Sequence, residues 1–300
     1  MALVDRLQDE AVTIYLLHGV VSESRHRVRN YTHKHICAAQ FDQLLADLLN
    51  AGSPVSMADI GDATLSHRTL PSRAFAMTFD DGFENNYSVA APILKRYGVP
   101  ATFYVTTNFI DHNRLSWIDE IEYAVENVDA VCSAQPFATA TDTFRTVEEK
   151  QELLDGIRRY VKGHPSLDPY AFAEEFRRGL GVGPPIPDPA LDQKLTWDQI
   201  RELQRDTLFT IGGHGVTHRI LTHLDVAELE SEVRTSIERL HRETNHVPVL
   251  YSYPEGLAHC YSDEVIKCLK ENGILSCPTA EDGINVIGDD LFRLKRIMVT

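Results

Sequence analysis

The stretch AMTFDDGFENNYSVAAPILKRYGVPATFYVT, residues 76–106, decides the fold. An apolar run ends at Asp80 and Asp81, a helical segment then closes at Gly98, and a second apolar run follows. A strand, a helix and a strand in this order predict a right-handed parallel unit. Two adjacent carboxylates at the end of a buried strand repel each other, so they must be paired or bind a metal.

The same alternation of apolar runs and helical segments recurs along the chain. Strands are expected at residues 11–21, 74–81, 101–107, 208–213, 249–256 and 293–299. Helices are expected between them at residues 38–52, 88–98, 196–206, 226–245 and 262–273. This order predicts an α/β fold with a parallel sheet. Residues 1–300 are expected to form a single domain, with a mostly helical insertion at about 111–206.

Composition and charge exclude several classes of protein. The chain has 300 residues and a formal net charge of -15, which disfavours binding to nucleic acid. Its five cysteines form no CxxC pair, which fits a reducing compartment. The first residues lack the basic region of a signal peptide, and no run of about 18 apolar residues suggests a membrane span. A cytoplasmic protein is therefore expected, and its oligomeric state stays open.

Polar side chains follow several of the expected strands. They are His18, Asp80, Asp81, His214, His218 and the turn at residues 253–256. Because the carboxyl ends of parallel strands share one edge, these side chains are expected to converge. The two histidines alone would also fit surface positions, and the two aspartates alone would also fit a helix cap. Their joint occurrence at strand ends favours a site for a divalent metal, which two imidazoles and a carboxylate can bind.

Three segments resemble, in order, the motifs of the polysaccharide deacetylases, carbohydrate esterase family 4. They are MTFDDGFENNYSVAAPILKRYGVPATFYV, IGGHGVTHRILTHL and YSYPEG. Three further segments, YLLHGVV, LTWDQIRELQRD and RLKRIMV, resemble the exopolysaccharide-type subgroup. The resemblance implies a distorted (β/α)7-type barrel of parallel strands. It also implies a metal-dependent N-deacetylase that removes acetate from an N-acetylated amino sugar of a polysaccharide or its precursor.

The resemblance also assigns roles to particular residues. Asp81, His214 and His218 would hold one divalent ion, with zinc the first expectation and nickel, cobalt, iron or manganese also fitting. Asp80 would act as the general base on the attacking water. The backbone N–H of Glu255 would help to hold the oxyanion of the intermediate.

The sequence departs from the family pattern in two places. YSYPEG contains no arginine that could brace the base, and the C-terminal segment has no histidine to protonate the leaving amine. The proton donor therefore stays open between Asp80 itself, His18 and solvent. Two other functions also stay open, namely hydrolysis of a cyclic amide and silent binding of a sugar. The His-rich segment at residues 26–35 is expected to be a solvated loop.

Overall fold

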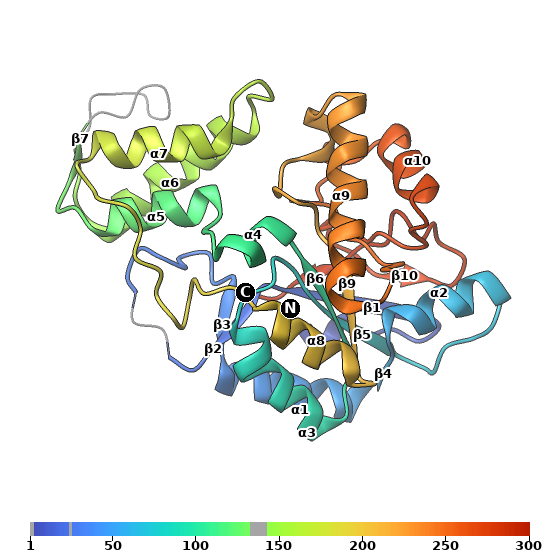
Figure 1. Cartoon of the computed structure of the whole chain (residues 1–300). Coiled ribbons are helices and arrows are strands. Elements are labelled where there is room, and N and C mark those ends of the chain that lie inside the picture. The colour runs from blue at the N-terminus through green and yellow to red at the C-terminus, as the bar shows by residue number, and fades with distance from the viewer. Residues whose placement is uncertain (1–2, 24–25, 133–142) are drawn as a thin grey trace. The chain divides into compact units, whose positions relative to one another are not determined.

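The computed structural model describes residues 3–23, 26–132 and 143–300, which form two compact units (Figure 1). The first unit comprises Met1–Glu23, His35–Arg114 and Gln193–Thr300. The second comprises Ser24–Lys34 and Leu115–Asp192. The helical insertion is therefore shorter at both ends than the predicted range, and it is joined by a segment from near the N-terminus.

A seven-stranded sheet forms the centre of the first unit. Its strands are β1 (Ala11–Leu17), β4 (Ser53–Pro54), β5 (Ala74–Phe79), β6 (Ala101–Val105), β9 (Phe209–Gly213), β10 (Asn285–Val286) and β11 (Ile297–Met298). The order β1-β5-β6-β9 is parallel throughout, β4 pairs with β5, and β11 pairs with β1 in parallel. Only β10 runs antiparallel to β1. The parallel sheet confirms the predicted fold class.

The parallel order continues beyond β9 through single pairings. Gly213 pairs with Tyr251, and Leu250 pairs with Ser276, both in parallel. The strand expected at residues 249–256 is therefore reduced to two paired residues. The strand expected at 11–21 is interrupted at His18, and its second part is β2 (Gly19–Val21), which pairs with β3 (His35–Cys37) in a separate two-stranded sheet. These interruptions are what makes the arrangement a distorted barrel.

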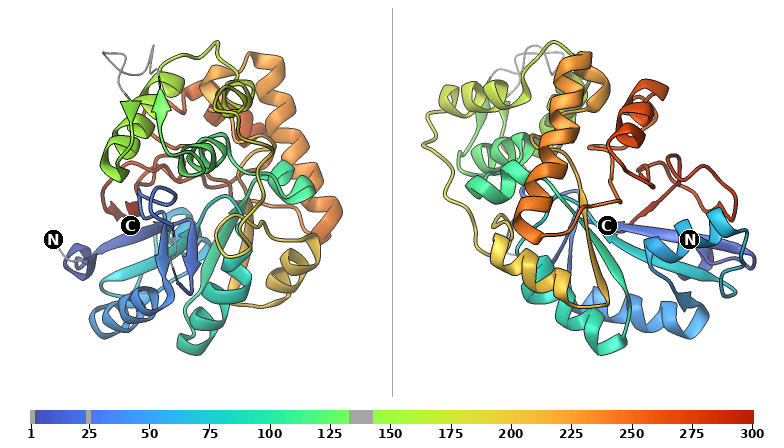
Figure 2. Two further views of the ribbon diagram at one scale, coloured as in Figure 1. Left: turned by 90° about the vertical axis from the view of Figure 1, so that its left-hand side faces the viewer. Right: turned by 45° about the vertical axis from the view of Figure 1, so that its right-hand side comes forward.

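Helices cover both faces of this sheet (Figure 1 and Figure 2). They are α1 (Ala38–Ala51), α2 (Met57–Ser66), α3 (Ala91–Tyr97), α4 (Thr107–His112), α8 (Trp197–Arg205), α9 (Val226–Thr244) and α10 (Asp263–Glu271), with short turns at Leu3–Arg6, Asn86–Ala90 and Leu221–His223. Side chains of α1, α3 and α8 pack with Tyr15, Phe75 and Phe103. Those of α2, α9 and α10 pack with Ile14 and Ala76 from the opposite face. Alternate strand residues thus face two apolar layers.

Local signals explain where several helices begin and end. The side chain of Thr196 caps α8 by accepting the N–H of Gln199, which is the role that threonine favours before a helix. Gly98 ends α3 with φ 66°, a left-handed conformation that glycine adopts without strain. Among the residues described, no helix has both the length and the apolar composition that a membrane crossing requires.

The second unit has an apolar core of its own. Its elements are α5 (Trp117–Glu126), α6 (Val147–Lys162), α7 (Pro169–Gly179) and the antiparallel pair β7 (Val131–Cys132) and β8 (Thr143–Phe144). Trp117 and Ile121 of α5 pack with Leu154 and Ile157 of α6 and Ala173 of α7. This burial gives the inserted helices a hydrophobic contribution to stability that is separate from the central sheet.

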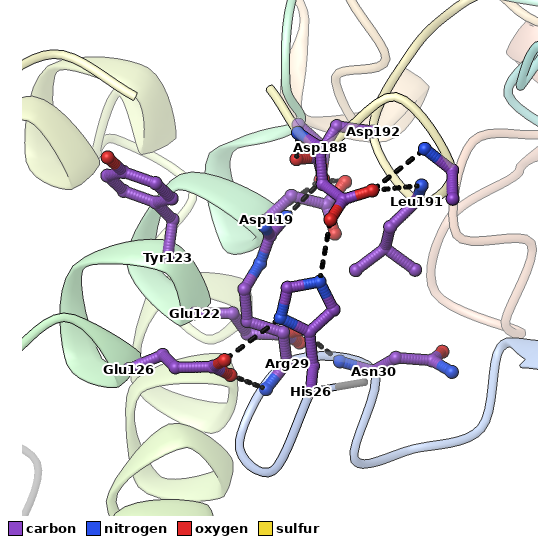
Figure 3. A network of polar contacts seen from close by, with 12 residues as sticks. His26, Arg29, Asn30, Asp119, Glu122, Tyr123, Glu126, Asp188, Leu191 and Asp192 are labelled. Atoms are coloured by element: carbon purple, nitrogen blue, oxygen red, sulfur yellow. Dashed lines mark hydrogen bonds and ion pairs between the residues drawn. The ribbon is translucent and has the colours of Figure 1, made fainter. Parts of the chain in front are cut away.

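Acidic residues on one face of α5 bind the segment at residues 26–34 (Figure 3). Glu126 accepts the backbone N–H of Val28 at 3.1 Å and of Arg29 at 2.7 Å, and it pairs with Nδ1 of His26 at 2.9 Å. The other ring nitrogen of His26 faces Asp188 at 3.2 Å. Two further acids of α5 take part, since Glu122 accepts the N–H of Asn30 and Asp119 pairs with Lys34.

The expectation of a solvated loop at residues 26–35 is wrong. Val28, Arg29 and Asn30 are buried, and the Arg29 guanidinium is paired with Asp192. The positions 119, 122 and 126 lie on one helical face because they are three and four residues apart. Backbone N–H groups and the side chain of Lys34 therefore anchor the segment to α5, while the charge of Arg29 is paired outside that helix.

Candidate metal centre and active site

Three potential metal ligands meet at the carboxyl ends of β5 and β9. Asp81 follows β5, while His214 and His218 follow β9. Nε2 of His214 lies 3.6 Å from Oδ1 of Asp81, and Nε2 of His218 lies 3.2 Å from the same oxygen. One ligand atom from each of the three residues lies within 4.8 Å of the other two. The convergence expected from the strand ends is therefore present in the structure.

The hydrogen bonds of His214 show which of its nitrogens is free to bind a metal. Nδ1 lies 2.8 Å from the carbonyl oxygen of Ser252, which can only accept, so Nδ1 donates. Burial lowers the pKa of His214 to about 4, so the ring is neutral at pH 7 and Nε2 carries a lone pair. This is the tautomer that a metal ligand requires.

The surroundings of Asp81 also fit a bound cation. Burial alone would raise the pKa of Asp81, but His218 outweighs it, and the pKa lies well below its usual range. Its buried Oδ1 receives no well-aligned hydrogen bond from the described residues. Nε2 of the neutral His214 ring therefore carries a lone pair 3.6 Å from a carboxylate oxygen. A divalent cation would neutralise this arrangement, and two imidazole nitrogens with one carboxylate oxygen form a suitable donor set.

Several residues of the site have a strained backbone. Asp81, His218 and Glu255 have φ angles of 74°, 60° and 63°, in the left-handed region that side chains other than glycine rarely adopt. Each such residue costs on the order of 1–3 kcal/mol and persists only where its surroundings enforce it. This backbone strain lowers the stability of the fold, and it directs these residues toward the end of the sheet.

Asp80 is held by an arginine that the sequence motifs did not reveal. Nη1 of Arg296 donates to Oδ1 of Asp80 at 2.9 Å, and Nη2 donates to Oδ2 at 2.8 Å. Burial alone would raise the pKa of Asp80, but Arg296 outweighs it and lowers the pKa. The side chain of Arg296 is itself buried, with 1% of its surface exposed. The brace missing from YSYPEG is thus supplied by the C-terminal segment RLKRIMV, and Asp80 is kept ionised.

Ser252 connects Asp80 to the metal ligands. Its hydroxyl donates to Oδ2 of Asp80 at 3.2 Å and accepts from Nη2 of Arg296 at 2.8 Å. Its carbonyl oxygen is the group that orients His214. The segment YSYPEG therefore braces the base and one ligand through a serine, a role that no expectation from the sequence assigned.

His18 and Glu255 lie at the same edge of the sheet. His18 lies between β1 and β2 and is half-buried. Its charge contributes to lowering the pKa of both Asp80 and Asp81. Its carbonyl oxygen accepts from Nδ2 of Asn86 at 2.8 Å, so the turn after the two aspartates fixes its backbone. Glu255 contributes to raising the pKa of His218, so it also lies near the ligands. The structure thus brings all six predicted site residues into one region.

The profile of the polysaccharide deacetylase family matches residues 67–276. The chain belongs to this family. The matched range contains Asp80, Asp81 and both histidines, whereas His18 and Arg296 lie outside it. Family membership agrees with the resemblance of the three motifs, all of which lie within the matched range.

A curated relative shares a short segment with this member of the family. The poly-beta-1,6-N-acetyl-D-glucosamine N-deacetylase of Escherichia coli (strain K12) is 36% identical over 62 residues. The aligned segment covers 21% of this chain and 9% of the relative, so the chain matches only a small part of that protein's length.

Solved structures with low sequence identity share the fold. The deacetylase PplD of Streptococcus pyogenes, in complex with acetate, has a TM-score of 0.62 and 17% identity, with 97% of this chain and 93% of that chain covered. IcaB from Ammonifex degensii has a TM-score of 0.61 and 17% identity, with 98% and 94% covered. Both likenesses extend over nearly the whole chain and show a shared fold.

Proposed function

We propose that this protein is a divalent-metal-dependent N-deacetylase that acts on an N-acetylated amino sugar of a polysaccharide or its precursor. The observation that carries the proposal is the Asp81–His214–His218 donor group next to the buried Asp80–Arg296 pair. Family membership and the name of the Escherichia coli relative support the reaction and the substrate class.

The metal would be held by Asp81, His214 and His218, with zinc as the first expectation from the ligand types. When bound, such an ion polarises the acetyl carbonyl and makes water a stronger nucleophile at neutral pH. The structure supports this through the neutral ring of His214 and the short distances from Oδ1 of Asp81 to Nε2 of both histidines.

Asp80 would take a proton from the attacking water as the water oxygen adds to the acetyl carbonyl carbon. Arg296 supports this role because it keeps Asp80 ionised and fixes the plane of its carboxylate. The backbone N–H of Glu255 would donate to the oxygen that becomes negative. The C–N bond then breaks, acetate leaves, and the sugar amine takes up the proton, which Asp80 returns to it.

The proposal is tested by measuring acetate release from a panel of N-acetylated sugars after zinc loading. The panel should contain a β-1,6-linked N-acetylglucosamine oligomer, nucleotide- and lipid-linked N-acetyl sugars, and a cyclic amide. Acetate release from a sugar that is lost in Asp80→Asn would support the proposal. Hydrolysis of the cyclic amide alone, or binding of the oligomer without release of acetate, would support the two other functions instead.

The cytoplasmic location stays a prediction. Fractionation of cells that produce the protein from its own gene tests it, and recovery outside the cytoplasm would contradict it.

A further inference from the structure

The segment between the two histidines has no regular secondary structure, yet its carbonyl groups are bonded. Gly215 O accepts the N–H of Thr107 at 3.1 Å, and Val216 O accepts the N–H of Asn108 at 3.0 Å. Both donors belong to the first turn of α4, where N–H groups have no partner within the helix. The segment is therefore held on its carbonyl side by α4.

The donors of the same segment converge on one carboxylate oxygen of α9. Oε1 of Glu232 accepts the N–H of Val216 at 2.8 Å, the N–H of Thr217 at 2.6 Å and the hydroxyl of Thr217 at 2.9 Å. Glu232 is buried, and hydrogen bonds to a charged acceptor are stronger than neutral ones. Both helices reach the segment at the carboxyl end of β9 (Figure 1).

Gly215 makes the close approach of Glu232 possible. A Cβ at Gly215 would lie 2.9 Å from Oε1 of Glu232, and the φ angle of Gly215 is 84°. His218, which ends the segment, has a left-handed backbone that is unfavourable for a residue with a side chain. Contacts from outside the segment are therefore needed to hold this backbone conformation.

We propose that Glu232 is a positioning residue that fixes the 215–217 segment and thereby directs Nε2 of His218 toward Asp81. The inference rests on the proposed metal site and assigns Glu232 no contact with metal or substrate. Loss of its three hydrogen bonds would remove the acceptor that two backbone N–H groups share next to the proposed ligand His218.

Two substitutions separate the geometry of Glu232 from its charge. Glu232→Asp keeps the negative charge but moves the carboxylate back by one methylene group, beyond good reach of the N–H groups. Glu232→Gln loses the charge but keeps the length and one acceptor oxygen. If Glu232 acts by position, zinc binding is weakened more by Asp than by Gln, and if it acts by charge the order is reversed.

The first measurement is the dissociation constant for Zn²⁺ of each folded variant by calorimetry. We expect about a 10- to 100-fold weaker affinity for Glu232→Asp, with Glu232→Gln nearer to the wild type. Glu238→Ala is the matched control, because Glu238 is on the same helix with its side chain 69% exposed, and we expect it to bind zinc as the wild type does. Equal affinities in all variants, or weaker binding by Gln than by Asp, would overturn the proposal.

The second measurement does not depend on the metal. Amide hydrogen exchange of Val216 and Thr217 in the metal-free protein should be faster in Glu232→Asp by at least about 10-fold. Unchanged exchange would overturn the proposal even if zinc binding fell. If the wild type bound neither zinc nor another divalent ion, the proposed function would fail, and the exchange rates would still decide whether Glu232 fixes the segment.

Discussion

Arg296 and Asp80 are 216 positions apart in the sequence, yet they form two parallel hydrogen bonds of 2.9 and 2.8 Å in the interior of the first unit. Both side chains are buried. A buried carboxylate without its cation would carry a large desolvation penalty. The pair therefore links the stability of the fold to the ionisation of the proposed base.

Replacing Arg296 alone should destabilise the folded protein more than removing the charges of both Arg296 and Asp80. We expect Arg296→Met to lower the free energy of unfolding of the metal-free protein by about 3–5 kcal/mol, because it leaves Asp80 buried without a partner. The double variant Arg296→Met, Asp80→Asn should recover part of this loss. Urea unfolding of both proteins measures the difference. If the double variant were no more stable than the single variant, the loss of stability would not come from leaving Asp80 without its partner.

His18→Ala should keep a kcat close to that of the wild type. The reason is that Asp80 can return the proton it takes from water, so no second acid is needed. The measurement is kcat of the zinc-loaded variant with the sugar that the wild type deacetylates, alongside its zinc content. A loss on the order of 10²-fold or more with full zinc content would instead identify His18 as the acid.

The contacts of Glu126 should make the second unit sensitive to acid. Burial alone would raise the pKa of Glu126, but the N–H of Arg29 and His26 outweigh it and lower the pKa. Because the pKa is lower in the folded state, the carboxylate stabilises the fold at a pH above its unfolded-state pKa of about 4.3. This stabilisation is lost as the pH falls through the folded-state pKa. Glu126→Gln should therefore lower the free energy of unfolding by about 1 kcal/mol at pH 7, since the group is half-exposed.

The effect of the same substitution should shrink as the pH falls below about 4.3, because the wild-type carboxyl group then becomes protonated. Trp117 lies in the core of the second unit and reports its unfolding by fluorescence. A Trp197→Phe background leaves Trp117 as the only tryptophan, because the chain has two. A difference that stays constant as the pH is lowered from 7 through the acid range would contradict the role of the charge.

The two tryptophans also test whether the chain unfolds as a single domain. Trp197 starts α8 in the first unit, and Trp117 starts α5 in the second. Trp197→Phe leaves Trp117 as the reporter, and Trp117→Phe leaves Trp197. The single-domain prediction requires both variants to unfold at the same urea midpoint, once the effect of each substitution on stability has been subtracted. Circular dichroism of each variant provides that allowance. Two separate fluorescence transitions would show that residues 1–300 form two domains.

The parts of the fold and site that could be predicted depend on neighbours in sequence. The apolar run before Asp80, the glycine that ends α3 and the threonine that caps α8 each act within a few residues. The convergence of the two aspartates and two histidines was also accessible, because strand ends meet at one edge of a parallel sheet, whereas the choice of Asp81 as a ligand rests on the resemblance to the family.

The missed residues act across long distances in the sequence. Arg296 reaches Asp80 from the position just before β11. Glu232 reaches the histidine segment from a helix face, where the sequence does not distinguish a buried acid from the other residues of an amphipathic helix. The anchoring of residues 26–34 depends on acids of α5 that lie about 90 to 100 positions away. No local periodicity indicates such pairs.

The separate roles of the two adjacent aspartates are the central claim, and paired substitutions test it most directly. Zinc content and kcat should be measured for the wild type, Asp80→Asn and Asp81→Asn, each shown to be folded. Asp80→Asn should keep its zinc and lose about 10²–10⁴-fold in kcat, while Asp81→Asn should lose zinc. Zinc lost from Asp80→Asn but retained by Asp81→Asn, or an Asp80→Asn variant with full activity, would contradict the account.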